Sequence, residues 1–269
     1  MMEPLTGEVI EQIRFYRDGF FGYGETGDFA YFSAAHFAPI LLMLLAVFLI
    51  YRFRNRLKGW KWDEDFRFLL GALCLITFFS YYCRVLYAGT ENSGRTTLLT
   101  KLPFEFCDLN ICLTAFMVMK KSRKLFGISF LFTVTFGILP LCTPAVILKT
   151  GPTYFKYYQF WLMHILPFVI DFYMLFVHDF RLKKSDVFRA FALAEVLLLV
   201  AIYMNARIPD ANFCFIARET DGASLANIMP ESMLAKWAIY TLAGLLLFSL
   251  AFWIYRAVLK RTQKTKPPR

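Results

Sequence analysis

The stretch Leu102–Asn110 reads LPFEFCDLN and opens an apolar segment that continues to Met119. Four polar side chains stand at the start of this segment, namely Glu105, Cys107, Asp108 and Asn110. Unpaired polar groups are costly in a bilayer, so such residues usually mark a site. The alternative is that the segment begins in water and that these residues cap it. Under both interpretations this stretch marks the polar entrance of an apolar segment.

The composition is that of a membrane protein. Of 269 residues, 58% are hydrophobic, against about 45 to 50% in ordinary soluble domains. The formal net charge of +10 could suggest nucleic acid, but the basic residues fall in short clusters between apolar runs. That arrangement is typical of the positive-inside rule. We therefore expect an all-α polytopic membrane bundle whose partners are membrane lipids, with no nucleic-acid partner; the sequence leaves protein partners open.

The apolar runs predict seven transmembrane helices, since about 20 apolar residues at about 1.5 Å each cross the hydrocarbon core. The predicted spans are residues 31–51, 66–87, 102–119, 125–148, 157–178, 187–206 and 234–256. The fourth span contains Gly137, Pro140 and Pro144. Because proline removes a backbone hydrogen bond, the second half of that span is predicted to be kinked or broken.

Charge asymmetry predicts the orientation of these spans. The loops on one side and the C-terminal tail carry 18 Lys and Arg, against 8 on the other side. We expect the N-terminus outside and the C-terminus in the cytoplasm. The predicted parts are an extracytoplasmic segment 1–29 without a cleavable signal peptide, a seven-helix membrane domain 30–256 and a basic cytoplasmic tail 257–269. The expected location is the cell membrane, as a multi-pass protein of a bacterial plasma membrane.

The cysteines and histidines do not form a recognisable metal motif. The six cysteines include no CxxC pair, and the three histidines are scattered along the chain. We expect no disulfide framework, no metal site and no cofactor.

Polar residues of five predicted spans fall at a similar depth in the outer half of the bilayer. They are His36, Arg84, Cys107 with its neighbours, Gln159 with His164, and Asn205. Asp171 and Glu195 are also intramembrane and need partners, but they lie deeper or nearer the cytoplasm. The prediction is that the outer set converges on one cavity, although sequence gives depth and not the direction in which each helix faces.

Helical geometry sharpens the opening stretch. At about 100° per residue, Glu105, Asp108 and Cys112 share one face, and Cys107, Asn110 and Thr114 share roughly the opposite face. These two polar faces, on opposite sides of the helix, cannot both contact lipid. Either neighbouring helices enclose this helix, or Pro103 starts an irregular first turn that lets the groups gather. In both cases the helix is predicted to be central.

These residues suggest limited chemistry. A thiol becomes nucleophilic beside a base, so Cys107 near His164 is a candidate pair for acyl transfer. Glu105 near His36 or His164 could instead activate a water. The simpler alternatives are an inert Cys107, an ion pair between Asp108 and Arg84, and a structural hydrogen bond at His164.

The motifs LPxxxCDL at Leu102–Leu109 and QFxxxH at Gln159–His164, with His36 in the first span, resemble the bacterial YwaF-type integral membrane proteins. These are grouped with the eukaryotic transmembrane protein 164. The resemblance covers residues 30 to 256 and implies a seven-helix bundle. From the eukaryotic branch it implies an acyltransferase that moves fatty acyl groups between phospholipids through a cysteine with a histidine partner, which matches His164.

The chain departs from that family pattern at the expected nucleophile. The family's cysteine directly follows the proline, where Phe104 stands here, and the histidine usual in bacterial members two residues after the proline is Glu105 here. Cys107, one turn further along, is the hypothetical replacement.

Together, these observations predict a membrane-embedded lipid acyltransferase or lipid hydrolase that acts from the outer half of the bilayer. The expected catalytic residues are His164, Cys107 and Glu105, and the expected substrate-binding residues are His36, Arg84, Asp108, Gln159 and Asn205. The alternative is a small-solute transporter or receptor with a polar cavity at the same depth, which the predicted break in the fourth span favours.

Overall fold

The computed structural model describes residues 19–22, 29–88, 99–144, 150–218 and 229–264 as a helical bundle. Its elements are α2 Ala34–Leu57, α3 Asp63–Ala88, α5 Phe106–Met119, α6 Arg123–Thr135, α7 Ile138–Cys142, α8 Phe155–Phe176, α9 Lys184–Arg207, the short 3-10 helix η2 Phe213–Phe215, and α10 Met233–Lys264. No strand occurs among these described ranges. The all-α prediction is confirmed for them. Of the predicted segment 1–29 only residues 19–22 and 29 are described, and the predicted tail from residue 257 begins as the last part of α10, which continues to Lys264.

Six segments of the described chain are long and apolar enough to cross a membrane. They are Ala34–Leu57, Asp63–Leu86, Arg123–Cys142, Phe155–Phe176, Lys184–Arg207 and Met233–Val258. The predicted third span is shorter: α5 has 14 residues, or about 21 Å, because its helix starts at Phe106 rather than Leu102. The structure therefore shows a multi-pass membrane protein with six long candidate spans and one short apolar helix.

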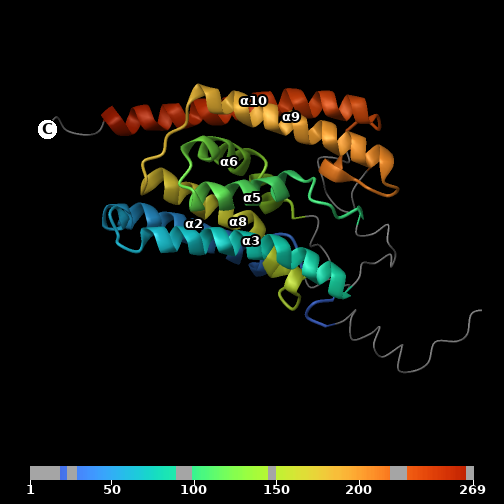
Figure 1. The fold of residues 1–269 in the computed structure, drawn as a ribbon, viewed down its shortest axis with the longest axis horizontal. Helices are drawn as coiled ribbons and strands as arrows, with labels where there is room; N and C mark the ends of the chain where they lie inside the picture. The colour runs from blue at the N-terminus through green and yellow to red at the C-terminus, as the bar shows by residue number, and fades with distance from the viewer. Residues whose placement is uncertain (1–18, 23–28, 89–98, 145–149, 219–228, 265–269) are drawn as a thin grey trace, which may run out of the picture.

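The bundle has three layers (Figure 1). Helices α5, α6 and α8 form the middle layer, with α2 and α3 on one side and α9 and α10 on the other. Helix α5 packs against α3, α6 and α8, so it is central, as predicted. Large apolar side chains of the outer helices face outward; Leu42 of α2 is 66% exposed and Leu242 of α10 is 69% exposed. An apolar surface of this kind suits contact with lipid.

The helices alternate in direction along the bundle. Lys58, Asp63, Lys121 and His178 line one pocket, which brings together the C-terminal ends of α2, α5 and α8 and the N-terminal end of α3. We call this the Asp63 end. The opposite end, where α5 begins, is the Glu105 end. The basic loops 51–65, 120–124 and 181–184 all lie at the Asp63 end.

The fourth predicted span is interrupted between α6 and α7. The backbone N–H groups of Phe136 and Gly137 both donate to the Phe132 carbonyl, each at 3.0 Å. A Cβ atom at Gly137 would lie 2.6 Å from the Thr133 carbonyl oxygen, so glycine permits this tight turn. The predicted break is therefore present, and it lies at Phe136–Gly137, with Pro140 inside α7.

Candidate functional site at the Glu105 end

The start of α5 explains one of the polar residues singled out there, Asp108. Pro103 disfavours helical backbone in the residue before it, and α5 begins only after Glu105, whose backbone is extended with φ −94° and ψ 153°. The backbone N–H of Glu105 donates to the Asp108 carboxyl at 3.4 Å. Asp108 thus acts as the capping-box partner of the first turn, and the capping alternative describes this residue.

The side chain of Glu105 makes a contact with a distant part of the chain. Its Oε2 atom accepts a hydrogen bond from the backbone N–H of Cys214 at 3.0 Å. Cys214 lies in η2 with φ 54° and ψ 19°, a left-handed backbone that costs about 1 to 3 kcal/mol for a residue with a side chain. Strained backbone of this kind persists only where the surrounding contacts stabilise it. Here the left-handed conformation of Cys214 directs its backbone N–H toward the Glu105 carboxyl.

Asn205 holds the strained segment. Its amide oxygen accepts the Phe213 N–H at 2.8 Å, and its amide nitrogen donates to the Phe213 carbonyl at 3.0 Å. The thiol of Cys214 donates to the Phe104 carbonyl at 3.2 Å. Burial raises the pKa of this thiol well above its ordinary value, so it stays protonated. The structure therefore gives Asn205, predicted to bind substrate, a positioning contact with the backbone beside Cys214.

Four side chains gather at this point, and we call them the carboxyl–thiol cluster: Glu105, Cys107, Asp108 and Cys214. Glu105, Cys107 and Asp108 are half-buried, and Cys214 is buried. The Asp108 backbone amide contacts the Cys107 sulfur, and both carboxyls lie within electrostatic range of it. The groups beside Cys107 that can accept a proton are therefore carboxyls.

Arg84 of α3 lies near the carboxyl–thiol cluster. Its guanidinium donates to the Gly22 carbonyl at 2.8 Å. Tyr81, almost one turn earlier on α3, is within electrostatic range of both Arg84 and Asp108. Tyr81 thus lies close to the start of α5, whereas the Arg84 guanidinium contacts the Gly22 backbone.

His164 forms its hydrogen bond within α8. Its Nδ1 lies 2.7 Å from the Phe160 carbonyl, and because a carbonyl only accepts, Nδ1 carries the proton. The Nε2 lone pair is then left as the basic position of the ring. The Phe160 ring lies 4.4 Å from the imidazole between centroids. His164 is buried with its ring held in a fixed orientation, and its contacts lie in α8 rather than in the carboxyl–thiol cluster.

His36 and Gln159 have structural partners. The His36 Nδ1 accepts the Phe32 N–H at 3.1 Å, and its Nε2 lies 2.8 Å from the Leu141 carbonyl. Both ring nitrogens are therefore used, and the ring ties α2 to α7. Gln159 donates to the Thr77 carbonyl at 3.4 Å, which ties α8 to α3. The predicted convergence thus divides into the carboxyl–thiol cluster with Arg84 and Asn205, and separate contacts of α8 and α2.

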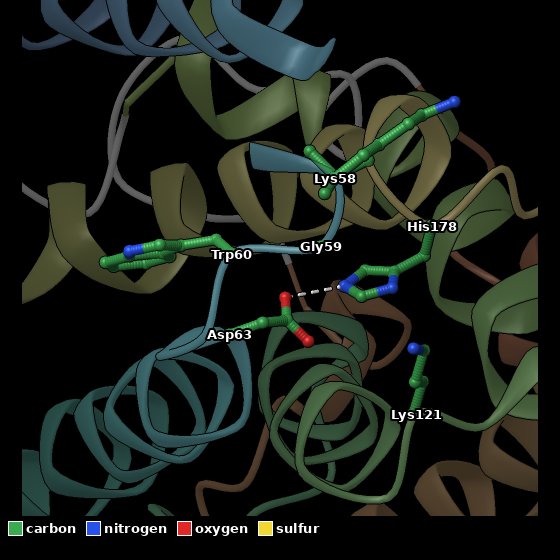
Figure 2. A pocket seen from close by; sticks show the side chains of 7 residues that line it. Lys58, Gly59, Trp60, Asp63, Lys121 and His178 are labelled. Carbon is green, nitrogen blue, oxygen red and sulfur yellow. Dashed lines mark hydrogen bonds and ion pairs between the residues drawn. The ribbon is translucent and has the colours of Figure 1, made fainter. Parts of the chain in front are cut away.

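A second polar centre lies at the Asp63 end (Figure 2). Its cavity of about 440 Å³ is lined by Lys58, Gly59, Trp60, Asp63, Lys121, Val177 and His178. In Figure 2 the His178 ring points at the Asp63 carboxyl, and the two atoms joined by the dashed line are 2.9 Å apart. Burial lowers the pKa of His178 despite this carboxylate. This pocket could not be predicted, because its residues come from segments that look unrelated in sequence.

Cys214 and Tyr81 were also missed as site residues. Cys214 stands 107 positions after Cys107 in a polar insertion, and no local pattern connects it to α5. Tyr81 is one aromatic residue among many in an apolar helix. A signal existed only for Cys214, as a cysteine in the one sizeable polar insertion of the chain.

Comparison with known proteins gives one match. The sequence model of the TMEM164 family matches residues 31–255. No curated protein matches the chain, and no solved structure does. The family match covers every helix that builds the carboxyl–thiol cluster and the Asp63 pocket.

Proposed function

Because this chain belongs to the TMEM164 family, we propose that it is a membrane-embedded enzyme that transfers or hydrolyses the fatty acyl groups of membrane lipids. The observation that carries the proposal is the carboxyl–thiol cluster, where a half-buried thiol lies beside two carboxyls at a helix N-terminus. A nucleophile with an adjacent base is the arrangement that covalent acyl transfer needs. The family's expected acyltransferase activity agrees with this chemistry.

In the proposed reaction, the Cys107 sulfur attacks the carbonyl carbon of a lipid ester. The thiol proton passes to the Glu105 carboxylate and then to the leaving alkoxide oxygen as the C–O bond breaks. The acyl group stays on Cys107 as a thioester. An acceptor hydroxyl, or water in hydrolysis, then attacks the thioester, and its proton returns through Glu105 to the sulfur.

The remaining predicted residues have supporting roles in this proposal. Arg84 is positioned to hold a phosphate headgroup, and Asn205 keeps Cys214 in the backbone geometry that orients Glu105. His164, with Nε2 as its basic nitrogen, is a second candidate base, which would activate water directly if Cys107 is not the nucleophile. His36, Gln159 and Asp108 support the surrounding helices through their hydrogen bonds.

The test uses purified protein in phospholipid vesicles with a radiolabelled acyl chain and a lysophospholipid acceptor. We expect labelled product and a hydroxylamine-sensitive thioester on the protein. Cys107→Ala and Glu105→Gln should each lower turnover by about 100-fold or more. Cys83→Ala is the matched control, since Cys83 is an exposed thiol of α3. Absence of turnover, or turnover unchanged in Cys107→Ala, Glu105→Gln and His164→Gln, would overturn the proposal.

A small-solute transporter or receptor is the second candidate. The break between α6 and α7 favours it, since discontinuous helices often line binding sites in transporters. Uptake or saturable binding of a water-soluble ligand by the vesicles, without acyl turnover, would select this function.

We also propose that the chain crosses the membrane seven times, with its N-terminus outside and its C-terminus in the cytoplasm, in a bacterial plasma membrane as a YwaF-type protein. The basic loops gathered at the Asp63 end support this orientation. The short helix α5 would be the third crossing. A green fluorescent protein fused to the C-terminus should fluoresce, and alkaline phosphatase fused there should be inactive; the reverse pattern contradicts the orientation.

A further inference from the structure

A buried polar network lies in the middle layer of the bundle, away from the carboxyl–thiol cluster. At its centre is Asp171 of α8, which is 0% exposed. Its Oδ2 atom accepts hydrogen bonds from the Thr133 hydroxyl at 2.7 Å and the Ser129 hydroxyl at 3.1 Å, both on α6. Three helices contribute, because Asn110 of α5 donates its amide N–H to Thr133 at 2.9 Å.

Two oxygen atoms of this network have no hydrogen-bond partner among the described residues. They are the Oδ1 atoms of Asp171 and Asn110, and both are fully buried. The Thr133 hydroxyl accepts a hydrogen bond from the Asn110 amide and donates one to the Asp171 carboxyl. The Asn110 and Asp171 side chains therefore lie on either side of Thr133. Buried acceptors without a donor are unfavourable, and these two indicate that the network accommodates something electropositive.

The hydrogen count of the network leads to the same conclusion. Thr114 contacts the Asn110 carbonyl at 2.8 Å and the Ser129 hydroxyl at 2.8 Å, and Ser129 also contacts Asp171. These three contacts need three hydrogen atoms, but the two hydroxyls supply two. One hydrogen atom is therefore missing when Asp171 is ionised. A proton on the Asp171 carboxyl supplies it, whereas a cation would replace the contact that lacks a hydrogen by binding to the oxygens on both sides of it.

Among the described residues, no fixed positive charge stands beside Asp171 to neutralise it. Its interactions with the described residues are the two hydroxyl hydrogen bonds, and no Lys or Arg contributes. The titratable group that faces it from α3 is Cys74, itself in range of Cys112 on α5. Its neighbours on α6 are hydroxyls, and His164 and His178 lie seven residues away on either side. A buried carboxylate without compensation is strongly disfavoured.

We infer that Asp171, Asn110, Ser129, Thr133 and Thr114 form a binding site for one small monovalent cation, of the sodium type, which exchanges with a proton on Asp171. The donors are all oxygen atoms, which suits a hard cation. A divalent ion would leave an extra charge in an apolar interior. The described residues hold no group of three His, Cys, Asp or Glu side chains that could hold a metal ion, so the proposed site relies on one carboxylate together with amide and hydroxyl oxygens.

The test measures the thermal unfolding of the full chain in detergent at pH 8, in NaCl or in choline chloride at equal ionic strength. At a Na⁺ concentration about 100 times its Kd, we expect Tm to rise by about 5 to 10 °C. The rise should shrink at pH 5.5, where the proton competes, and should be absent in Asp171→Asn. Glu195→Gln is the matched control, because this carboxyl lies in α9 and contacts Trp237 and Thr241; it should keep the full rise.

Binding of ²²Na⁺ to the unaltered protein in a scintillation proximity assay gives a second measurement that does not depend on the folding of a variant. We expect saturable binding that unlabelled NaCl displaces and choline chloride does not. Absence of saturable binding by the unaltered protein overturns the inference. A sodium-dependent rise in Tm that persists in Asp171→Asn would do the same. The site is independent of the proposed acyl chemistry, so either can fail alone.

Discussion

Two aspartates of this bundle are fully buried, and their surroundings differ in charge. Asp186, in the first turn of α9, is paired with Arg123 at 2.7 Å and Arg189 at 3.5 Å, and it accepts the Lys183 N–H at 2.8 Å. Asp171, in the interior of α8, has two hydroxyl partners. Asp186 is therefore held as an anion by arginines. For Asp171 we propose instead that a proton and a sodium ion compete for the carboxyl.

The largest expected effect is that of Asp186→Asn. Removing the charge weakens the hydrogen bonds to two arginines that are themselves 26% and 44% exposed, and a hydrogen bond to a charged group contributes about 1.5 to 3 kcal/mol. Thermal unfolding in detergent, in the absence of Na⁺, checks it. Asp171→Asn is the comparison variant and should lower stability by about 1 kcal/mol or less, because the amide replaces a protonated carboxyl. Equal losses in the two variants would erase the distinction.

The next largest loss of stability is expected where α6 packs against Asp186. A Cβ atom at Gly127 of α6 would collide with the Asp186 carboxyl, so Gly127→Ala should cost about 1 to 3 kcal/mol in unfolding free energy. Gly244→Ala is the control, since the nearest atom to its new Cβ is Phe136 Cζ at 3.8 Å. That variant should be neutral or slightly stabilising. A harmless Gly127→Ala would mean that Asp186 is not held as closely as the structure indicates.

The Asp63 pocket, where His178 contacts the Asp63 carboxyl, predicts a change of stability with pH. Burial lowers the pKa of His178 below its usual 6.5, so the unfolded chain binds more protons near that pH. Stability should therefore fall as pH decreases from about 7 through 6.5 toward the folded-state pKa. Unfolding curves between pH 5 and 8 measure it. His178→Gln should flatten this part of the curve, and an unchanged slope would assign it to another group.

The smallest effect is expected for Asp179, a solvent-exposed carboxyl. Asp179 pairs with Lys58 at 2.5 Å, and the two side chains are 56% and 39% exposed. Exposed pairs contribute about 0 to 1 kcal/mol, so Asp179→Asn should change Tm by little, and less still at high salt. A loss comparable to that of Asp186→Asn would contradict the view that burial decides the contribution.

The fold was predictable where the sequence is periodic or punctuated. Long apolar runs identify six spans, and Gly137 correctly indicates a break in the fourth. Helix α5 was predicted too long because Leu102 and Phe104 look like a continuation of its apolar run. Pro103 disfavours helical backbone at Leu102, and α5 starts later still, because Glu105 is extended and stands as the residue before its first turn.

The site was predictable in part. Glu105, Cys107 and Asp108 could be singled out because they are polar in an apolar context. Their neighbour Cys214 could not, since its position depends on a left-handed turn held by Asn205. Asp171 was recognised as needing a partner, but its hydroxyl partners on α6 are ordinary helix residues. The position of a residue along a predicted helix does not tell which side chains of other helices it contacts.

The shortness of α5 has a consequence for the backbone at its ends. At about 21 Å, this central helix is shorter than the hydrocarbon thickness of about 30 Å, while its neighbours are long enough to span it. Because α5 is enclosed by α3, α6 and α8, protein rather than lipid surrounds its ends. The extended residues before α5 and the turn at Cys214 therefore place non-helical backbone at membrane depth, which is tolerated only where it is buried in protein or lines a cavity.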